Sequence, residues 1–332
     1  MNSLWPIVNR LPLSPAMSSL AIGTTSIIGK IVTNLVTRGC VQVMGRDQIA
    51  KLYNPHRKKR PTISLGNHES VVDEPLVWAL VLSLSQVYGD PEFHRYTLTA
   101  QEICFSNLFN SLFFSLCRGI AVQRGCGLYQ PGVDRAIELC RDNHWIHIFP
   151  EGRVVQEDRM ASFKWGTARI IAESTIVDPA QSRVISTPDI FGVYLRGLRR
   201  IAPLNQPFRF LENFGKPIEI AFGGNFDVGD LILKHVKKYP DGIIARRTVP
   251  REDHSIPWFD SVTQVLDKED KEDKEKASSL FTPLSVSAPH PTWQYHRVSE
   301  EERELYAAIT AQLERRMALL EEECLHNKFS GD

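Results

Sequence analysis

An apolar segment at residues 63–65 leads into a histidine, four further residues and an aspartate, and this arrangement limits the folds open to the chain more than any other. The histidine is His68, the aspartate is Asp73, and Pro75 stands where a helix can begin. Four intervening residues allow one tight turn, so the Asp73 carboxylate can reach a ring nitrogen of His68. That contact fixes the imidazole tautomer and leaves the other nitrogen to take a proton from an alcohol. The segment predicts a catalytic base, His68, oriented by Asp73.

A second apolar strand is predicted at residues 145–149, and it runs into Pro-Glu-Gly-Arg, which ends at Arg153. Proline stops the hydrogen-bonded ladder, so Glu151 is presented at the end of the strand, where a pocket forms. Residues 119–124 form a further predicted strand that ends in a cation, Arg124. Lys164, at the start of a predicted helix, supplies either a phosphate contact or an ordinary solvated lysine.

Taken in order, these segments resemble the motifs of the glycerolipid acyltransferase family, which are His-x4-Asp, a Gly...Arg segment and Phe-Pro-Glu-Gly. The resemblance covers about residues 15–230. Within the family, the chain is most similar to the branch that exchanges acyl chains between cardiolipin and other phospholipids. It implies an α/β fold with a glycerolipid acyltransferase-like mixed sheet flanked by helices. The family's fourth motif has a central proline, but Gly192 occupies that place here, so no site residue is carried over from it.

The same resemblance implies roles for the other motif residues. Arg124 would hold the phosphate of a lipid head group, because a guanidinium fork fits phosphate oxygens in pairs. Glu151 and Gly152 would help to bind the acceptor, with Arg153 nearby. No Gly-x-Ser-x-Gly elbow is present to supply a serine nucleophile, so direct acyl transfer to a lysophospholipid hydroxyl is expected.

The branch that it resembles needs no cofactor and no coenzyme A, and its expected partners are cardiolipin, lysophosphatidylcholine and a membrane surface. Three alternatives remain open. A coenzyme A-dependent lysophospholipid or glycerol-phosphate acyltransferase would use the same motifs. A non-enzymatic lipid-binding membrane scaffold would bind lipid without acyl transfer by His68 and Asp73. A serine-type phospholipase would need water as its acceptor.

The N-terminal 46 residues contain no acidic residue, which suits a mitochondrial targeting segment or a membrane-surface segment. Between residues 17 and 36 apolar side chains recur at helical spacing, but Lys30 and several hydroxyl groups interrupt them, so a spanning helix is not expected. The segment predicts a helix in one leaflet; a helix on the protein's own core is the alternative. The resemblance implies attachment to mitochondrial inner and outer membranes, at leaflets that face the intermembrane space.

Four segments are expected: a membrane-associating segment at residues 1–46, an acyltransferase domain at 47–230, an irregular and charged linker at 231–298, and an amphipathic helix at 299–326. The last begins with a capping box, Ser299 and Glu302, and docks either on the domain or on another copy, so a homo-oligomer is left open. Its apolar stripe consists of Leu305, Ile309, Leu313, Met317 and Leu320.

Composition narrows the remaining classes of function. Lys plus Arg and Asp plus Glu each number 39, so no global field favours nucleic acid. The six cysteines form no C-x-x-C pair, and His144 and His147 have no acidic or cysteine partner at ligand spacing, so neither a disulfide framework nor a metal site is expected. The basic cluster at residues 56–60 either attracts anionic lipid or is a solvated loop. The apolar run at 103–116 is either core or a wall for acyl chains.

Overall fold

The structure of the protein is a computed structural model, which describes residues 14–38, 40–52, 60–89, 94–178, 183–204, 215–242, 244 and 298–326. Its strands are β1 (Val41–Met44), β2 (Thr62–Gly66), β3 (Tyr96–Ala100), β4 (Gly119–Val122), β5 (Trp145–Ile148), β6 (Ile176–Asp178), β7 (Arg183–Ser186), β8 (Asp189–Arg196) and β9 (Ile218–Asn225). Seven of them form one sheet in the order β1-β9-β8-β2-β5-β3-β4, and β6 pairs with β7. β9 runs antiparallel to β8, whereas β8, β2, β5, β3 and β4 run the same way. The predicted mixed sheet is confirmed.

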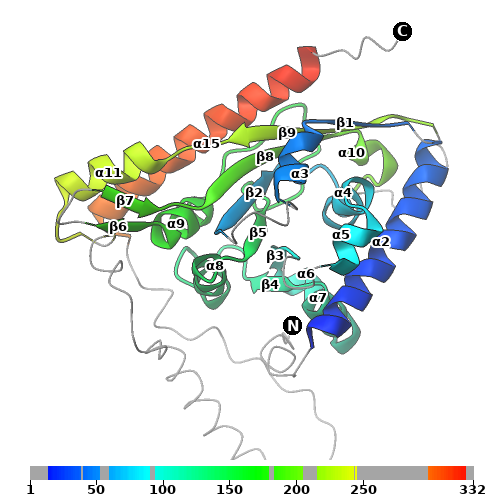
Figure 1. The fold of residues 1–332 in the computed structure, drawn as a ribbon, viewed down its shortest axis with the longest axis horizontal. Coiled ribbons are helices and arrows are strands. Elements are labelled where there is room, and N and C mark those ends of the chain that lie inside the picture. The colour runs from blue at the N-terminus through cyan, green and yellow to red at the C-terminus, as the bar shows by residue number, and fades with distance from the viewer. Residues whose placement is uncertain are drawn as a thin grey trace, which may run out of the picture.

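Helices cover both faces of this sheet (Figure 1). On one face lie α8 (Pro131–Arg141), α9 (Trp165–Ser174), α11 (Gly229–Lys238) and α15 (Glu300–His326). On the other lie α2 (Pro15–Thr37), α3 (Arg46–Leu52), α4 (Asp73–Val81), α5 (Leu84–Gly89) and α10 (Leu198–Ile201). The short helices α6 (Gln101–Cys104) and α7 (Leu108–Leu116) lie between β3 and β4 in the chain. The central strands are therefore buried on both sides, as expected where strands run parallel.

Side chains of β2 alternate between the two apolar cores. Ile63 and Leu65 face the core beneath α8 and α9, whereas Ser64 points to the opposite face. There its hydroxyl accepts a hydrogen bond from Trp145 Nε1 at 2.8 Å and lies 2.8 Å from His147 Nδ1. The Ser64 hydroxyl, the Trp145 indole N–H and His147 Nδ1 are therefore hydrogen-bonded within this buried layer.

The C-terminal helix α15 lies on its own chain, along β8 and β9 and beside α9 (Figure 1). The predicted capping box is confirmed: Ser299 N donates to Glu302 Oε2 at 2.8 Å, and Glu302 N donates to Ser299 Oγ at 3.1 Å. The predicted apolar stripe is confirmed as well, because each of its members is at most 5% exposed: Leu305, Ile309, Leu313, Met317 and Leu320.

The glycine of β8 at the place of the family's proline is explained by α15. A Cβ atom at Gly192 would lie 2.8 Å from Leu320 Cδ2 and 2.8 Å from Met317 Sδ. We therefore expect Gly192→Ala to lower the unfolding free energy by about 1–3 kcal/mol, as overpacked cores do. Urea titration checks this, with Gly224→Ala as the control, since a Cβ there meets nothing within 4 Å. Equal stability of the two variants would contradict the close packing.

The connecting segments contain a break between two helices and one difference from the expected organisation. Helix α4 ends at Val81 and α5 begins at Leu84, where the Ser83 hydroxyl accepts from Gln86 N at 3.2 Å. The segment expected to be an irregular linker begins instead within α11, which buries Ile232 and Val236. This apolar pair, four residues apart, was too short a helical signal to recognise. Residues 1–13, the cluster at 56–59 and residues 245–297 lie outside the described parts.

The N-terminal helix α2 buries mainly small and hydroxyl side chains and exposes most of its large apolar ones. Its small and hydroxyl side chains are buried against α4, α5 and α7, including Ser18, Ser19, Ser26, Thr33 and Thr37. Its large apolar side chains point outward instead: Met17, Leu20, Ile27, Ile28, Ile31, Val32 and Leu35. Among the described residues it is also the one helix long and apolar enough to cross a membrane, by length and composition only. The helix thus packs on its own chain, as the alternative expected, through small side chains and Ile22 rather than through most of its large apolar ones. Its contact with a lipid leaflet stays a prediction.

Candidate active site

The predicted pair forms at the end of β2. His68 follows the strand, and Asp73 opens α4 after a turn in which Asp73 N donates to Ser70 O at 3.2 Å. His68 Nδ1 lies 2.9 Å from Asp73 Oδ2, which also accepts from Ser70 N at 2.8 Å. Asp73 is fully buried, whereas one fifth of the His68 side chain is exposed. The geometry leaves Nε2 of His68 without a hydrogen-bond partner among the residues that the structure describes.

The end of β5 holds His68 from a second direction. The Phe149 ring stacks on the imidazole, with centroids 4.1 Å apart and planes inclined by 17°. Glu151 Oε1 accepts from His68 N at 2.8 Å, and Glu151 Oε2 accepts from Ala161 N at 2.6 Å. Val155 N donates to His68 O at 2.6 Å. Both carboxylate oxygens of Glu151 therefore accept hydrogen bonds from backbone N–H groups, which is a structural role. The binding of the acceptor lipid by Glu151 stays a prediction.

The carboxylates around His68 lie in a poorly solvated environment. Burial raises the pKa of Asp73, and the hydrogen bond from His68 opposes that shift. Burial also raises the pKa of Glu151, against the hydrogen bonds that it accepts from backbone. Burial and the charge of Asp73 raise the pKa of Glu69 to about 7. Burial keeps the pKa of His147 well below its usual range, so this second imidazole is neutral beneath the site.

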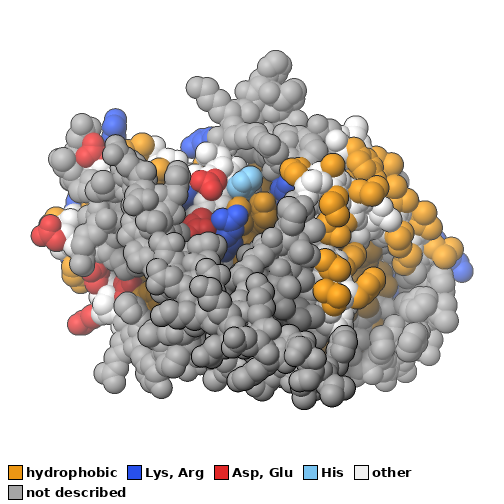
Figure 2. All heavy atoms as spheres, turned by 90° about the horizontal axis from the view of Figure 1, so that it is seen from below, with side chains coloured by type: hydrophobic (Ala, Val, Ile, Leu, Met, Phe, Trp, Pro, Cys, Tyr) orange, Lys and Arg blue, Asp and Glu red, His pale blue; other side chains and the backbone are white. Residues whose placement is uncertain are grey.

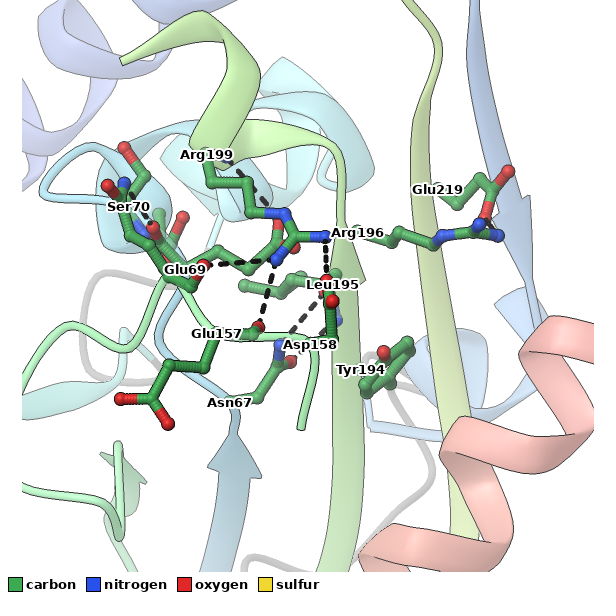
Figure 3. A network of polar contacts seen from close by, with 12 residues as sticks. Asn67, Glu69, Ser70, Glu157, Asp158, Tyr194, Leu195, Arg196, Arg199 and Glu219 are labelled. Atoms are coloured by element: carbon green, nitrogen blue, oxygen red, sulfur yellow. Dashed lines mark hydrogen bonds and ion pairs between the residues drawn. The ribbon is translucent and has the colours of Figure 1, made fainter. Parts of the chain in front are cut away.

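A cavity of about 220 Å³ lies between the loop after β5, the end of β8 and the end of α15. It is lined by Asn67 and Glu69, the neighbours of His68 in the chain, and not by His68 or Asp73 themselves. Figure 3 shows Arg199 of α10 reaching toward Glu69, Glu157 and Asp158. Arg199 Nη2 lies 3.0 Å from Asp158 Oδ1, its Nη1 donates to Glu157 O at 2.9 Å, and its Nε lies 3.7 Å from Glu69 Oε1. No site residue on α10 was predicted from the sequence, so the contacts that Arg199 makes here were missed.

The other predicted residues are only partly gathered at this site. Gly152, with φ of 69°, and Lys164 lie at the base of the loop that follows β5, where Lys164 N donates to Pro150 O at 2.7 Å. Arg153 is exposed, and its Nη2 lies 3.7 Å from Glu157 Oε1. Because β5 neighbours β2, these residues are close to His68 in the fold.

Arg124 lies farther along the same edge of the sheet. It follows β4, which is separated from β5 by β3, and its Nε is paired with Glu102. The cavity beside His68 is lined by Arg196 and Arg199 rather than by Arg124. Its contact with a lipid phosphate therefore stays a prediction, which needs a substrate long enough to reach along the strand ends.

Metal ligands are not gathered in the described parts of the chain, where no group of three His, Cys, Asp or Glu side chains could hold an ion. His144 lies just before β5 and His147 lies on it, where His147 Nδ1 is 2.8 Å from the Ser64 hydroxyl.

Glu69 should make stability depend on pH. Its pKa of about 7 in the folded chain exceeds the ordinary 4.5, so between these values the folded state holds a proton that the unfolded state releases. The unfolding free energy must therefore fall as pH rises through this window. We expect Glu69→Gln to be more stable relative to the unmodified protein at about pH 8 than at about pH 5, as measured by urea titration at both values. An equal difference at the two values would contradict the shift.

Comparison with known proteins agrees with this geometry. The family model named Acyltransferase matches residues 40–186. Tafazzin of Dictyostelium discoideum is 31% identical over 224 residues, which are 67% of this chain and 75% of that protein. The chain belongs to the tafazzin family. Tafazzin of Drosophila melanogaster is 30% identical over 70% of this chain and 57% of that protein, and N-acylphosphatidylethanolamine synthase of Arabidopsis thaliana is 30% identical over 74% and 82%.

As a member of the tafazzin family, the chain is an acyltransferase with phospholipid substrates. The enzyme class and the family predicted from the motifs are confirmed, and a phospholipid transacylase agrees with these matches. A non-enzymatic scaffold is thereby excluded as the main function. The matched residues 40–186 contain the His68–Asp73 pair and the loop after β5.

Proposed function

We propose that this tafazzin-family chain moves an acyl chain directly from a phospholipid to the hydroxyl of a lysophospholipid, without coenzyme A, and so remodels cardiolipin. The observation that carries the proposal is the contact of 2.9 Å between His68 Nδ1 and the buried carboxylate of Asp73. A buried anion on one ring nitrogen makes the other a base for an alcohol.

The reaction follows from this arrangement. His68 Nε2 takes the proton of the acceptor hydroxyl, and the resulting alkoxide attacks the ester carbonyl of the donor phospholipid. The tetrahedral intermediate then expels the donor's alkoxide, which receives the proton from the imidazolium. One ester bond forms and one breaks, so no external acyl carrier is consumed. Asp73 stabilises the imidazolium between the two proton transfers.

Much of the rate would come from holding both lipids against the base. In the proposal, Arg153 and Lys164 bind head-group phosphate near His68, Gly152 leaves room for the acceptor, and Arg124 contacts phosphate farther along the strand ends. Guanidinium and ammonium groups suit this role because they are permanent donors to phosphate oxygens.

The outer surface of the chain supports membrane attachment. Figure 2 shows apolar side chains gathered over the side of the molecule where α2 lies. Large side chains of α6 and α7 are exposed as well, namely Ile103, Leu108, Phe109 and Phe113. An apolar patch of this kind on a lipid enzyme fits a bilayer, while small buried side chains suit close helix packing. The proposed location is the mitochondrial membranes, at leaflets facing the intermembrane space.

The apolar face of α2 provides a test of this attachment. The double variant Ile28→Asp and Ile31→Asp should bind vesicles of phosphatidylcholine and cardiolipin at least about tenfold more weakly, because two exposed apolar side chains are replaced by charges. Vesicle co-sedimentation measures this. Asn34→Asp is the control, since Asn34 is an exposed polar residue of the same helix. Unchanged binding of the double variant would count against an α2-mediated attachment.

A transfer assay with purified lipids decides the proposed function. Phosphatidylcholine with one isotopically labelled chain is mixed with monolysocardiolipin and the protein, without coenzyme A, and the product is followed by mass spectrometry. Label in cardiolipin is the expected result. Transfer only when labelled acyl-coenzyme A replaces phosphatidylcholine would favour the coenzyme A-dependent alternative.

One relative suggests a second candidate acceptor. The protein of Arabidopsis thaliana, which this chain resembles over 82% of that protein's length, is named an N-acylphosphatidylethanolamine synthase. A neutral amine can replace the hydroxyl as nucleophile in the same mechanism. Adding phosphatidylethanolamine to the assay tests this, because an N-acylated product resists the mild alkali that cleaves esters.

A further inference from the structure

The helix α15 lies outside residues 40–186, which the acyltransferase family model matches, yet it contacts the loop that follows β5. Glu314 Oε1 accepts a hydrogen bond from Phe163 N at 2.8 Å, although 151 positions separate the two residues. The Phe163 side chain is itself buried, and its backbone precedes α9. This contact is therefore built by the tertiary fold and fixes one end of the loop.

From this contact a short series of hydrogen bonds leads to the base. Two residues before Phe163, Ala161 N donates to Glu151 Oε2 at 2.6 Å. The other oxygen of Glu151 accepts from His68 N at 2.8 Å. Three hydrogen bonds thus join α15, the loop and the backbone of His68. The outer end of the series is a carboxylate on a helix whose apolar stripe is buried in the core.

The end of α15 reaches the same region through a second contact. Tyr194 OH donates to Glu321 Oε1 at 2.9 Å, which ties the helix to β8. Glu321 and Leu325 also line the cavity beside His68. The helix therefore contacts both the loop that braces His68 and the wall of this cavity.

We propose that Glu314 is a positioning residue of the acyl transfer, which acts through Phe163, the loop and Glu151 to place His68. The inference rests on the proposed function for its kinetic readout. Small misplacements of a catalytic group cost large factors in rate, because the reacting atoms must meet at short distance. Glu314 touches neither lipid in this proposal, so its loss lowers kcat and leaves KM largely unchanged.

The test compares Glu314→Ala, Glu314→Gln and Glu322→Ala in the labelled-lipid assay. Glu314→Ala should lower kcat about tenfold with KM within about twofold, because misplacement affects the chemical step. Glutamine keeps an oxygen that can accept from Phe163 N, so Glu314→Gln should recover kcat to within about threefold. Glu322 is exposed on the same helix, and its substitution should change nothing.

Hydrogen exchange provides a readout that does not need activity. In Glu314→Ala, amides of residues 151–163 should exchange faster while those of β5 stay protected. Unchanged kcat and exchange would overturn the proposal, and so would equal losses in the alanine and glutamine variants. If the alanine variant fails to fold, slow exchange of the Phe163 and Ala161 amides in the unmodified protein supports the series and fast exchange overturns it. Absence of transfer in the unmodified protein would instead contradict the proposed function.

Discussion

Replacing His68 with alanine is expected to lower kcat/KM for acyl transfer by about 10³-fold, because the base that removes the acceptor proton is lost while lipid binding remains. The ring is only partly buried and its contacts are the Asp73 carboxylate and the Phe149 face, so the fold should tolerate the change. The measurement is the initial rate of label transfer between phosphatidylcholine and monolysocardiolipin at several acceptor concentrations. His326→Ala, at the exposed end of α15, is the control.

Asp73→Asn separates orientation from proton transfer at the same site. The amide occupies the same space but brings no charge to stabilise the imidazolium, and it can present the wrong tautomer of His68. We expect a loss of about 10²–10⁴-fold in kcat with the folded structure retained. A His68→Ala variant with full transfer activity would remove the basis of the proposed mechanism, and full activity in Asp73→Asn alone would remove the role of the carboxylate.

Replacing Arg169 with methionine is expected to lower the unfolding free energy by about 3–5 kcal/mol, because the buried Glu173 carboxylate and the partly buried Asp134 carboxylate would lose their cation. Arg169 Nε lies 2.8 Å from Glu173 Oε1, and its Nη2 lies 2.5 Å from Asp134 Oδ1. Its guanidinium also lies over the Tyr129 ring. The side chains of Arg169 and Glu173 are 5% and 3% exposed.

This network also fastens α15 to the domain. Tyr306 OH donates to Glu173 Oε1 at 3.3 Å, and Tyr129 OH donates to Glu302. Urea titration gives the stability of the variant, and Arg135→Met is the matched control. Arg135 makes an exposed pair with Glu138 on α8, whose loss should cost less than about 1 kcal/mol. Similar stabilities of the two variants would show that burial does not distinguish these ion pairs.

The amino-acid sequence was sufficient where the chemistry depends on residues close together in the chain. The turn from His68 to Asp73, the capping box at Ser299 and the apolar stripe of α15 are local patterns, and the structure contains each of them. The class of fold was implied by the resemblance of these short motifs to those of the glycerolipid acyltransferase family. Predictions that failed, such as the linker where α11 lies, had signals too short to separate a helix from a loop.

The tertiary structure decided the contacts between segments that are distant in the sequence. Only the fold shows that α2 buries its hydroxyl face, that Gly192 makes room for α15, and that Glu314 reaches Phe163. The contact of Arg199 with Asp158 belongs to the same class. By itself the sequence determined the contact of His68 with Asp73 and the enzyme family. The packing around them was settled only by folding, because a periodic pattern tells which face of an element is apolar but not which surface that face will meet.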